Sequence, residues 1–180
     1  MNSVIETRDL TKRFKQHIAV DGLDLLVPQG SVYGFLGPNG SGKSTTMKMI
    51  LGLTQPTKGE IELFGRPLTP TSRAAALPYI GSMIEAPPGY GHLTGAENMR
   101  IVRDMLGLVD AQIDRAMATV RLTEHKDKLV RNYSLGMKQR LGIAMALARD
   151  PSLLVLDEPT NGLDPAGIEE IRSLLIELAG

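Results

Sequence analysis

The chain has 180 residues, of which 42% are hydrophobic and 22% are charged, the ordinary range for one folded globular domain. Twenty basic residues balance twenty acidic ones, so the overall charge gives no indication of a nucleic acid or an anionic lipid surface as partner. The absence of cysteine excludes disulfides, thiolate catalysis and cysteine-ligated zinc, and it is consistent with a reducing cytoplasm.

Predicted strands dominate the first half of the chain. Alternating apolar and polar residues predict two antiparallel strands at residues 4–10 and 18–27. A continuous apolar run predicts a buried strand at residues 31–36, which leads through a glycine-rich segment into a helix at residues 44–53. Shorter elements are expected next: strands at residues 60–64 and 79–84, and between them a helix at residues 71–76.

Helical periodicity replaces this pattern between residues 93 and 149, where Thr94 is the expected N-cap of the first helix. Pro151 closes this region, and the apolar run at residues 153–156 predicts a buried strand. The final helix is predicted at residues 165–178, with four side chains directed inward: Ile168, Ile171, Leu175 and Leu178.

Neither a membrane span nor a secretory signal is predicted. The longest apolar run is far shorter than the roughly 20 residues that a transmembrane helix needs. The N-terminal residues mix charged and apolar side chains, so they lack the apolar centre of a signal peptide. We therefore expect a chain that starts inside the cell and reaches a membrane only through a partner subunit.

A phosphate-binding loop is the most specific motif in the sequence. Residues 37–44 match the pattern G-x-x-x-x-G-K-[ST] between a predicted strand and a predicted helix. Lys43 is expected to reach the β- and γ-phosphates, Ser44 to ligate Mg²⁺, and Thr45 to contact an inner phosphate. The alternative is an ordinary glycine-rich turn. The complete set of residues assigned to the nucleotide here is Gly37, Pro38, Asn39, Gly40, Ser41, Gly42, Lys43, Ser44 and Thr45.

Two carboxylates follow the apolar strand at residues 153–156. Ligands of open α/β sheets bind outside the carboxyl ends of the strands, where Asp157 and Glu158 are expected. Asp157 is assigned to Mg²⁺, and Glu158 to orienting or deprotonating the water that attacks the γ-phosphate. The alternative is that both are solvated residues of an exposed loop.

Residues 132–140 resemble the signature segment of ABC ATPases, which usually reads Leu-Ser-Gly-Gly-Gln followed by a basic residue, Gln and Arg. Ser134 and Gly136 retain two of the family's residues, whereas Leu135 and Met137 depart from the pattern. The resemblance implies that Ser134 and Gly136 face the γ-phosphate of an ATP held by a partner subunit. The alternative is an ordinary helix capped by Ser134.

Three further positions match the same family. The resemblance assigns Phe14 to stacking on adenine and Asp164 to a dimer contact; packing and helix capping are the alternatives. Glu85 stands where most ABC ATPases have a Gln that links metal and attacking water to the membrane subunit, so it is assigned to both metal and catalysis. Its loop is similar to the subgroup that exports bacitracin, lantibiotics and related antimicrobial peptides, although a solvated loop Glu would look alike.

The resemblance covers nearly the whole chain and implies its fold: an α/β P-loop NTPase of RecA-like ABC ATPase type with an N-terminal antiparallel β subdomain and an inserted helical subdomain. Residues 1–180 would form one domain. Its nucleotide-binding core would comprise residues 1–86 and 151–180, and residues 87–150 would form the helical subdomain. The expected cofactors are ATP and Mg²⁺, and the expected reaction is ATP hydrolysis coupled to transport.

The partners implied by the resemblance are an integral membrane permease and a second ATP-binding subunit, most simply another copy of this chain. The protein would then lie on the cytoplasmic face of the membrane, bound to its permease, with no nucleic acid partner. A non-transport ABC ATPase that acts on ribosomes or DNA is the alternative function. A P-loop kinase for a small metabolite ranks last because it does not explain residues 134–140. The transported substrate and the direction of transport are left open.

One part of the family pattern lacks a counterpart. ABC ATPases carry a switch histidine after the strand that follows the catalytic Glu, and the sequence ends before such a strand. His17, His92 and His125 are assigned no role. We therefore expect a truncated chain that is poorly stable and nearly inactive by itself.

Overall fold

Two compact units make up the computed structural model, which describes residues 3–85 and 87–179. The N-terminal unit comprises Met1–Pro78 with Leu178–Gly180, and the C-terminal unit comprises Tyr79–Glu177. The strands that follow Pro78 thus group with the helices. The assignment of residues 1–86 and 151–180 to one nucleotide-binding core stays a prediction.

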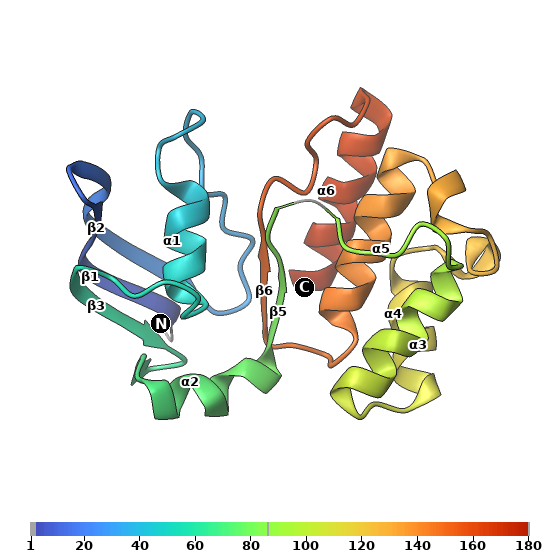
Figure 1. Cartoon of the computed structure of the whole chain (residues 1–180), viewed down its shortest axis with the longest axis horizontal. Coiled ribbons are helices and arrows are strands. Elements are labelled where there is room, and N and C mark those ends of the chain that lie inside the picture. The colour runs from blue at the N-terminus through green and yellow to red at the C-terminus, as the bar shows by residue number, and fades with distance from the viewer. Residues whose placement is uncertain (1–2, 86, 180) are drawn as a thin grey trace. The chain divides into compact units, whose positions relative to one another are not determined.

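An antiparallel sheet forms most of the N-terminal unit, as predicted (Figure 1). Its strand order is β2-β1-β3-β4, with β1 at Ser3–Phe14, β2 at His17–Pro28, β3 at Lys58–Leu63 and β4 at Arg66–Pro67. A tight turn at Lys15, whose φ is 51°, joins β1 to β2, so Phe14 pairs directly with His17. Alternation along the strands buries one set of side chains: Ile5, Leu10, Val20, Leu25, Val27, Ile61 and Leu63.

The same unit contains two helices besides the sheet. Helix α1 spans Lys43–Ile50, slightly shorter than predicted, and buries Thr46, Met49 and Ile50. Helix α2 spans Pro70–Ala76 and begins with a capping box between Thr69 and Ser72. Both helices are therefore confirmed, within the usual uncertainty of helix ends.

The predicted buried strand at residues 31–36 is wrong. These residues have no regular secondary structure, and the exposed fractions of Val32 and Leu36 are 56% and 92%. A strand of a parallel sheet needs neighbours for its backbone hydrogen bonds and cover on both faces. Among the described residues no strand pairs with this segment, so its apolar composition alone does not produce a strand.

The C-terminal unit contains a parallel pair of strands and four longer helices (Figure 1). Strand β5, Ile80–Met83, pairs in register with β6, Leu153–Leu156. The helices are α3 at Gly95–Leu106, α4 at Asp110–Thr119, α5 at Leu135–Leu147 and α6 at Pro165–Ala179. Short 3-10 turns occur at Leu77–Tyr79, Thr123–His125 and Val130–Asn132. These positions confirm the predicted strands and the predicted helical region.

One continuous hydrophobic core holds the helices of this unit together. Its fully buried members include Met99, Leu122, Leu141, Ile143 and Ile171, which come from all parts of the unit. Helix α6 contributes Ile171 and Leu174 to this core, but Leu178 is 36% exposed, so its predicted inward orientation is wrong. The core ends before the last turn of α6, and the helical period alone could not reveal where it ends.

Among the described residues, no helix combines the length and the apolar composition that crossing a membrane requires.

Candidate functional site

The glycine-rich loop of the N-terminal unit is a tight turn placed directly before α1. The Ser41 N–H donates to the Pro38 carbonyl at 3.1 Å, and Gly40 and Gly42 have left-handed φ values of 84° and 89°. A Cβ atom on Gly42 would clash with the Ala19 carbonyl of β2 and lie 2.9 Å from Val20 Cγ2. Glycine is therefore required at this position by both conformation and space.

Lys43, the first residue of α1, turns back over this loop. Its Nζ donates to the carbonyls of Gly37 at 2.8 Å and Pro38 at 3.1 Å, which places a positive charge above the loop backbone. The N-cap of helix α1 is Gly42, so no side chain caps the helix, and its first turn has no acidic residue. Ser44 and Thr45 lie in this turn, where backbone N–H groups and the helix dipole favour an anion such as phosphate.

Phe14 lies at the end of β1, in the same unit as the loop. Its side chain is 49% exposed, which argues against a role in core packing. The Lys12 ammonium lies 4.9 Å from the ring centroid and also donates to the Gln55 carbonyl. Lys12 pairs with Val20 across the β1–β2 hairpin, and the Val20 side chain lies close to Gly42 in space. The Phe14 ring therefore belongs to the hairpin that contacts the glycine-rich loop.

The carboxyl ends of β5 and β6 present three acidic residues in the C-terminal unit. The Asp157 N–H donates to the Met83 carbonyl at 2.9 Å and thereby extends the parallel ladder by one bond. Glu158 follows Asp157, and Glu85 follows Met83 by two residues, so all three begin from one edge of the strand pair. Asp157 and Glu158 thus follow the predicted strand β6, and Glu85 follows the neighbouring strand β5.

Glu85 and Glu158 share an uncommon backbone conformation. Their φ values are 74° and 48°, in the left-handed region that non-glycine residues adopt rarely and often at functional sites. Asn161 donates from Nδ2 to Glu158 Oε2 at 3.1 Å and so holds the side chain of Glu158. No sequence motif assigns a role to Asn161, although its spacing of three residues from Glu158 is a usable signal. Ala86, which follows Glu85 in the predicted loop, lies outside the described residues.

Asp157 is the residue that fits a metal ion best. It is 7% exposed, and its Oδ1 is buried without a hydrogen-bond partner, which is costly unless a further group binds it. Among residues 3–85 and 87–179, no group of three His, Cys, Asp or Glu side chains could hold a metal ion by itself. A single buried carboxylate fits Mg²⁺, because this ion commonly binds through one or two carboxylates and completes its octahedron with phosphate oxygens and water.

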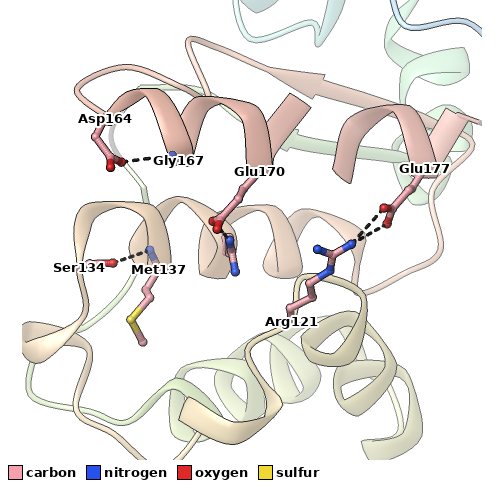
Figure 2. Close-up of polar contacts among 8 residues, drawn as sticks. Arg121, Ser134, Met137, Asp164, Gly167, Glu170 and Glu177 are labelled. Carbon is pink, nitrogen blue, oxygen red and sulfur yellow. Dashed lines mark hydrogen bonds and ion pairs between the residues drawn. The ribbon is translucent and has the colours of Figure 1, made fainter. Parts of the chain in front are cut away.

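The starts of α5 and α6 lie side by side in Figure 2. Ser134 Oγ accepts the Met137 N–H at 3.2 Å, and Asp164 Oδ1 accepts the Gly167 N–H at 3.2 Å, so each side chain caps its helix. A Cβ atom on Gly136 would lie 3.8 Å from Cδ2 of Leu163, and Leu163 is the residue that precedes Asp164. The segments that contain Ser134 and Asp164 therefore contact each other.

Within the described residues, two ion pairs connect α6, beyond its first turn, to other segments of the unit. Arg140 of α5 pairs with Glu170 of α6, and Arg121 pairs with Glu177 near the end of α6 at 3.0 Å (Figure 2). The first pair joins α6 to α5, and the second joins α6 to the segment that follows α4. Because both pairs are partly exposed, each adds little stability.

The predicted site residues thus fall into two groups. Phe14, the loop at residues 37–44 and Thr45 lie in the N-terminal unit. The C-terminal unit carries the remaining residues, which are Glu85, Ser134, Gly136, Asp157, Glu158 and Asp164. The roles of both groups and their assembly around one nucleotide stay predictions.

Comparison with known proteins gives concordant matches. Residues 20–161 match the family model described as ABC transporter. The bacitracin transport ATP-binding protein BcrA of Bacillus licheniformis is 49% identical over 180 residues, 99% of this chain and 58% of that protein. The lantibiotic transport ATP-binding protein SrtF of Streptococcus pyogenes is 42% identical over 172 residues, 96% of this chain and 73% of that protein.

The solved structures agree with the sequence matches. The protein cbiO1 from Clostridium perfringens, part of the ABC transporter complex cbiONQ, superposes with a TM-score of 0.89 at 27% identity. The match covers 99% of this chain and 74% of cbiO1. It confirms the predicted α/β fold class of ABC ATP-binding domains. This chain spans 58% of the length of the bacitracin relative, so the activity of a whole protein is a separate question.

Proposed function

The chain belongs to the ABC transporter family, and on this premise we propose that it binds ATP with Mg²⁺ and hydrolyses it to power a transporter. The observation that carries the proposal is the loop at residues 37–44, which curls through left-handed glycines beneath the Lys43 ammonium. A polyphosphate is the ligand that such a loop and the N-terminus of α1 would stabilise.

The proposed reaction divides the work among the residues of the two groups. Lys43 would bind the β- and γ-phosphate oxygens, and Thr45 an inner phosphate. Mg²⁺ would be held by Ser44, Asp157 and Glu85, and when bound it supplies charge neutralisation at the phosphates. Glu158, held by Asn161, would orient or deprotonate the attacking water.

The proposal includes a second ATP-binding subunit, most simply another copy of this chain. Ser134 and Gly136 would then face the γ-phosphate bound by the partner, and Asp164 would contact the partner. The adjacent starts of α5 and α6 support this, because a single surface carries both segments. An integral membrane permease would complete the transporter and hold this subunit at the cytoplasmic face of the membrane.

We propose antimicrobial peptides of the bacitracin and lantibiotic type as the transported substrates, and export as the direction. Two relatives, at 49% and 42% identity, are bacitracin and lantibiotic transport ATP-binding proteins, which supports this choice. Glu85 supports it as well, since its carboxylate stands where the loop of that subgroup has Glu.

Replacing Lys43 by Ala tests the nucleotide site directly. Because charge-assisted hydrogen bonds contribute about 1.5–3 kcal/mol, the affinity for Mg·ATP is expected to fall about 10- to 100-fold. Titration calorimetry of the purified chain measures this change. Lys58→Ala is the matched control, since Lys58 is an exposed lysine of the same unit that pairs with Asp9. Equal affinity in the parent and in Lys43→Ala would contradict the proposal, and so would transfer of the γ-phosphate to a small molecule.

Replacing Phe14 by Ala tests adenine stacking. Aromatic contacts contribute about 0.5–1.5 kcal/mol beyond buried area, so ATP binding should weaken about 2- to 10-fold. Binding of inorganic tripolyphosphate, which lacks the base, should be unchanged. Equal weakening for both ligands would place the effect in the loop and contradict the stacking role.

A further inference from the structure

The first turn of α3 contacts two segments that are far apart in the sequence. It is fixed by a capping box in which Thr94 Oγ1 accepts the Glu97 N–H at 3.1 Å and the Thr94 N–H donates to Glu97 Oε2 at 2.7 Å. From this turn, Asn98 is directed to the segment after Glu85, and Gly95 meets the segment that leads into Ser134. Each contact is specific in geometry.

The Asn98 side chain makes hydrogen bonds to both backbone polar groups of Tyr90. Its Oδ1 accepts the Tyr90 N–H at 2.7 Å, and its Nδ2 donates to the Tyr90 carbonyl at 3.1 Å and the Thr94 carbonyl at 2.9 Å. The Asn98 side chain is 2% exposed, so its amide group is shielded from water. Removing the side chain would take away the hydrogen-bond partner of the Tyr90 N–H, whereas the carbonyls of Tyr90 and Thr94 also accept the N–H groups of Leu93 and Asn98.

Tyr133, the residue before Ser134, is held on the other side of the same turn. It is 5% exposed, and its hydroxyl donates to the His125 carbonyl at 2.7 Å. A side chain on Gly95 would clash with this hydroxyl, so the glycine makes room for it. Burial raises the pKa of Tyr133, which keeps the hydroxyl protonated as a donor.

Backbone hydrogen bonds complete the connection. The Gly95 N–H donates to the Lys128 carbonyl and the Ala96 N–H to the Lys126 carbonyl, while the Val130 N–H donates to the Leu93 carbonyl. Helix α5 also approaches both sides of the Glu85 loop. A Cβ on Gly142 would clash with the Met83 sulfur and lie 3.1 Å from Pro88 Cδ.

We propose that Asn98 and Tyr133 are positioning residues for the ATPase reaction, which hold the Glu85 loop and the Ser134 end of α5 in one fixed frame through the first turn of α3. This inference rests on the proposed function for its purpose, since Glu85 and Ser134 are the groups being positioned. A purely structural role would predict a loss of stability with no change in the distance between the Glu85 loop and the Ser134 end of α5.

The absence of cysteine in the chain allows a direct test. Spin labels on Tyr90→Cys and Leu135→Cys, both exposed in the parent, report the distance between the two segments by pulsed electron resonance. We expect a narrow distance distribution that becomes about twofold broader or more in Asn98→Ala and in Tyr133→Phe. Tyr133→Phe deletes one oxygen and keeps the ring, so it provides the milder variant if Asn98→Ala does not fold.

Ile113→Val provides the control for general destabilisation. Ile113 lies in the same core and is 5% exposed, yet it contacts neither segment through a hydrogen bond; the change costs about 0.5–1.5 kcal/mol. A narrow distribution in Ile113→Val with broadening in the other two supports the inference. Distributions that stay narrow in folded Tyr133→Phe, or broaden equally in Ile113→Val, overturn it. Because the readout requires no nucleotide, failure to bind ATP would overturn the proposed function alone.

Discussion

Replacing Glu158 by Gln is expected to lower ATP turnover by about 100- to 10,000-fold, the range that a positioned general base contributes, and to leave Mg·ATP binding unchanged. Gln keeps the size of the side chain and can still accept the hydrogen bond from Asn161. It cannot take a proton from water, so only the chemical step should suffer. Phosphate release by the protein together with the proposed permease in membrane vesicles measures turnover.

The same change also tests the proposed transport. A bacterium that depends on the protein and its permease for bacitracin resistance should become sensitive when Glu158 is replaced by Gln. Glu177→Gln is the matched control, because Glu177 is an exposed carboxylate of the same unit that pairs with Arg121. Turnover that persists in Glu158→Gln would show that another group activates the water. Unchanged sensitivity to bacitracin despite lost turnover would contradict the proposed substrate but not the proposed ATPase activity.

The sequence is most informative where local chemistry determines local structure. The loop at residues 37–44 could be predicted because left-handed turns before a helix require glycine at Gly40 and Gly42. Ser134 and Thr94 could be recognised as caps because their side chains bond to the backbone only three residues away. The strand at residues 153–156 agrees with its prediction because all four of its residues are apolar and none of them is exposed.

Features that depend on distant partners were beyond the reach of sequence reasoning. Residues 31–36 have the composition of a buried strand, but no described strand pairs with them. Asn98 could not be distinguished from any helical Asn, since its partners lie eight and four residues away on a loop and in a cap. The left-handed conformations of Glu85 and Glu158 follow from their surroundings and leave no trace in composition.

The close approach of α5 to β5 gives a second large expected effect, this time on stability. Gly81 is buried in β5, and a Cβ atom there would clash with the Ala146 carbonyl oxygen and lie 2.9 Å from its carbon and 3.0 Å from Pro151 Cγ. Backbone atoms cannot rotate away as a side chain can, so α5 must shift. Gly81→Ala is therefore expected to lower the free energy of unfolding by about 3 kcal/mol, the upper end of ordinary overpacking.

Urea unfolding followed by circular dichroism measures this change. Ser82→Ala is the matched control, because Ser82 is the exposed neighbour in the same strand and should alter the free energy of unfolding by less than about 0.5 kcal/mol. Because β5 and β6 carry Glu85 and Asp157 at their ends, a shift of α5 should also disturb the carboxylates. An unfolding midpoint of Gly81→Ala equal to that of Ser82→Ala would mean that the helix can withdraw from the strand at little cost, and that the position of the carboxylates does not depend on this contact.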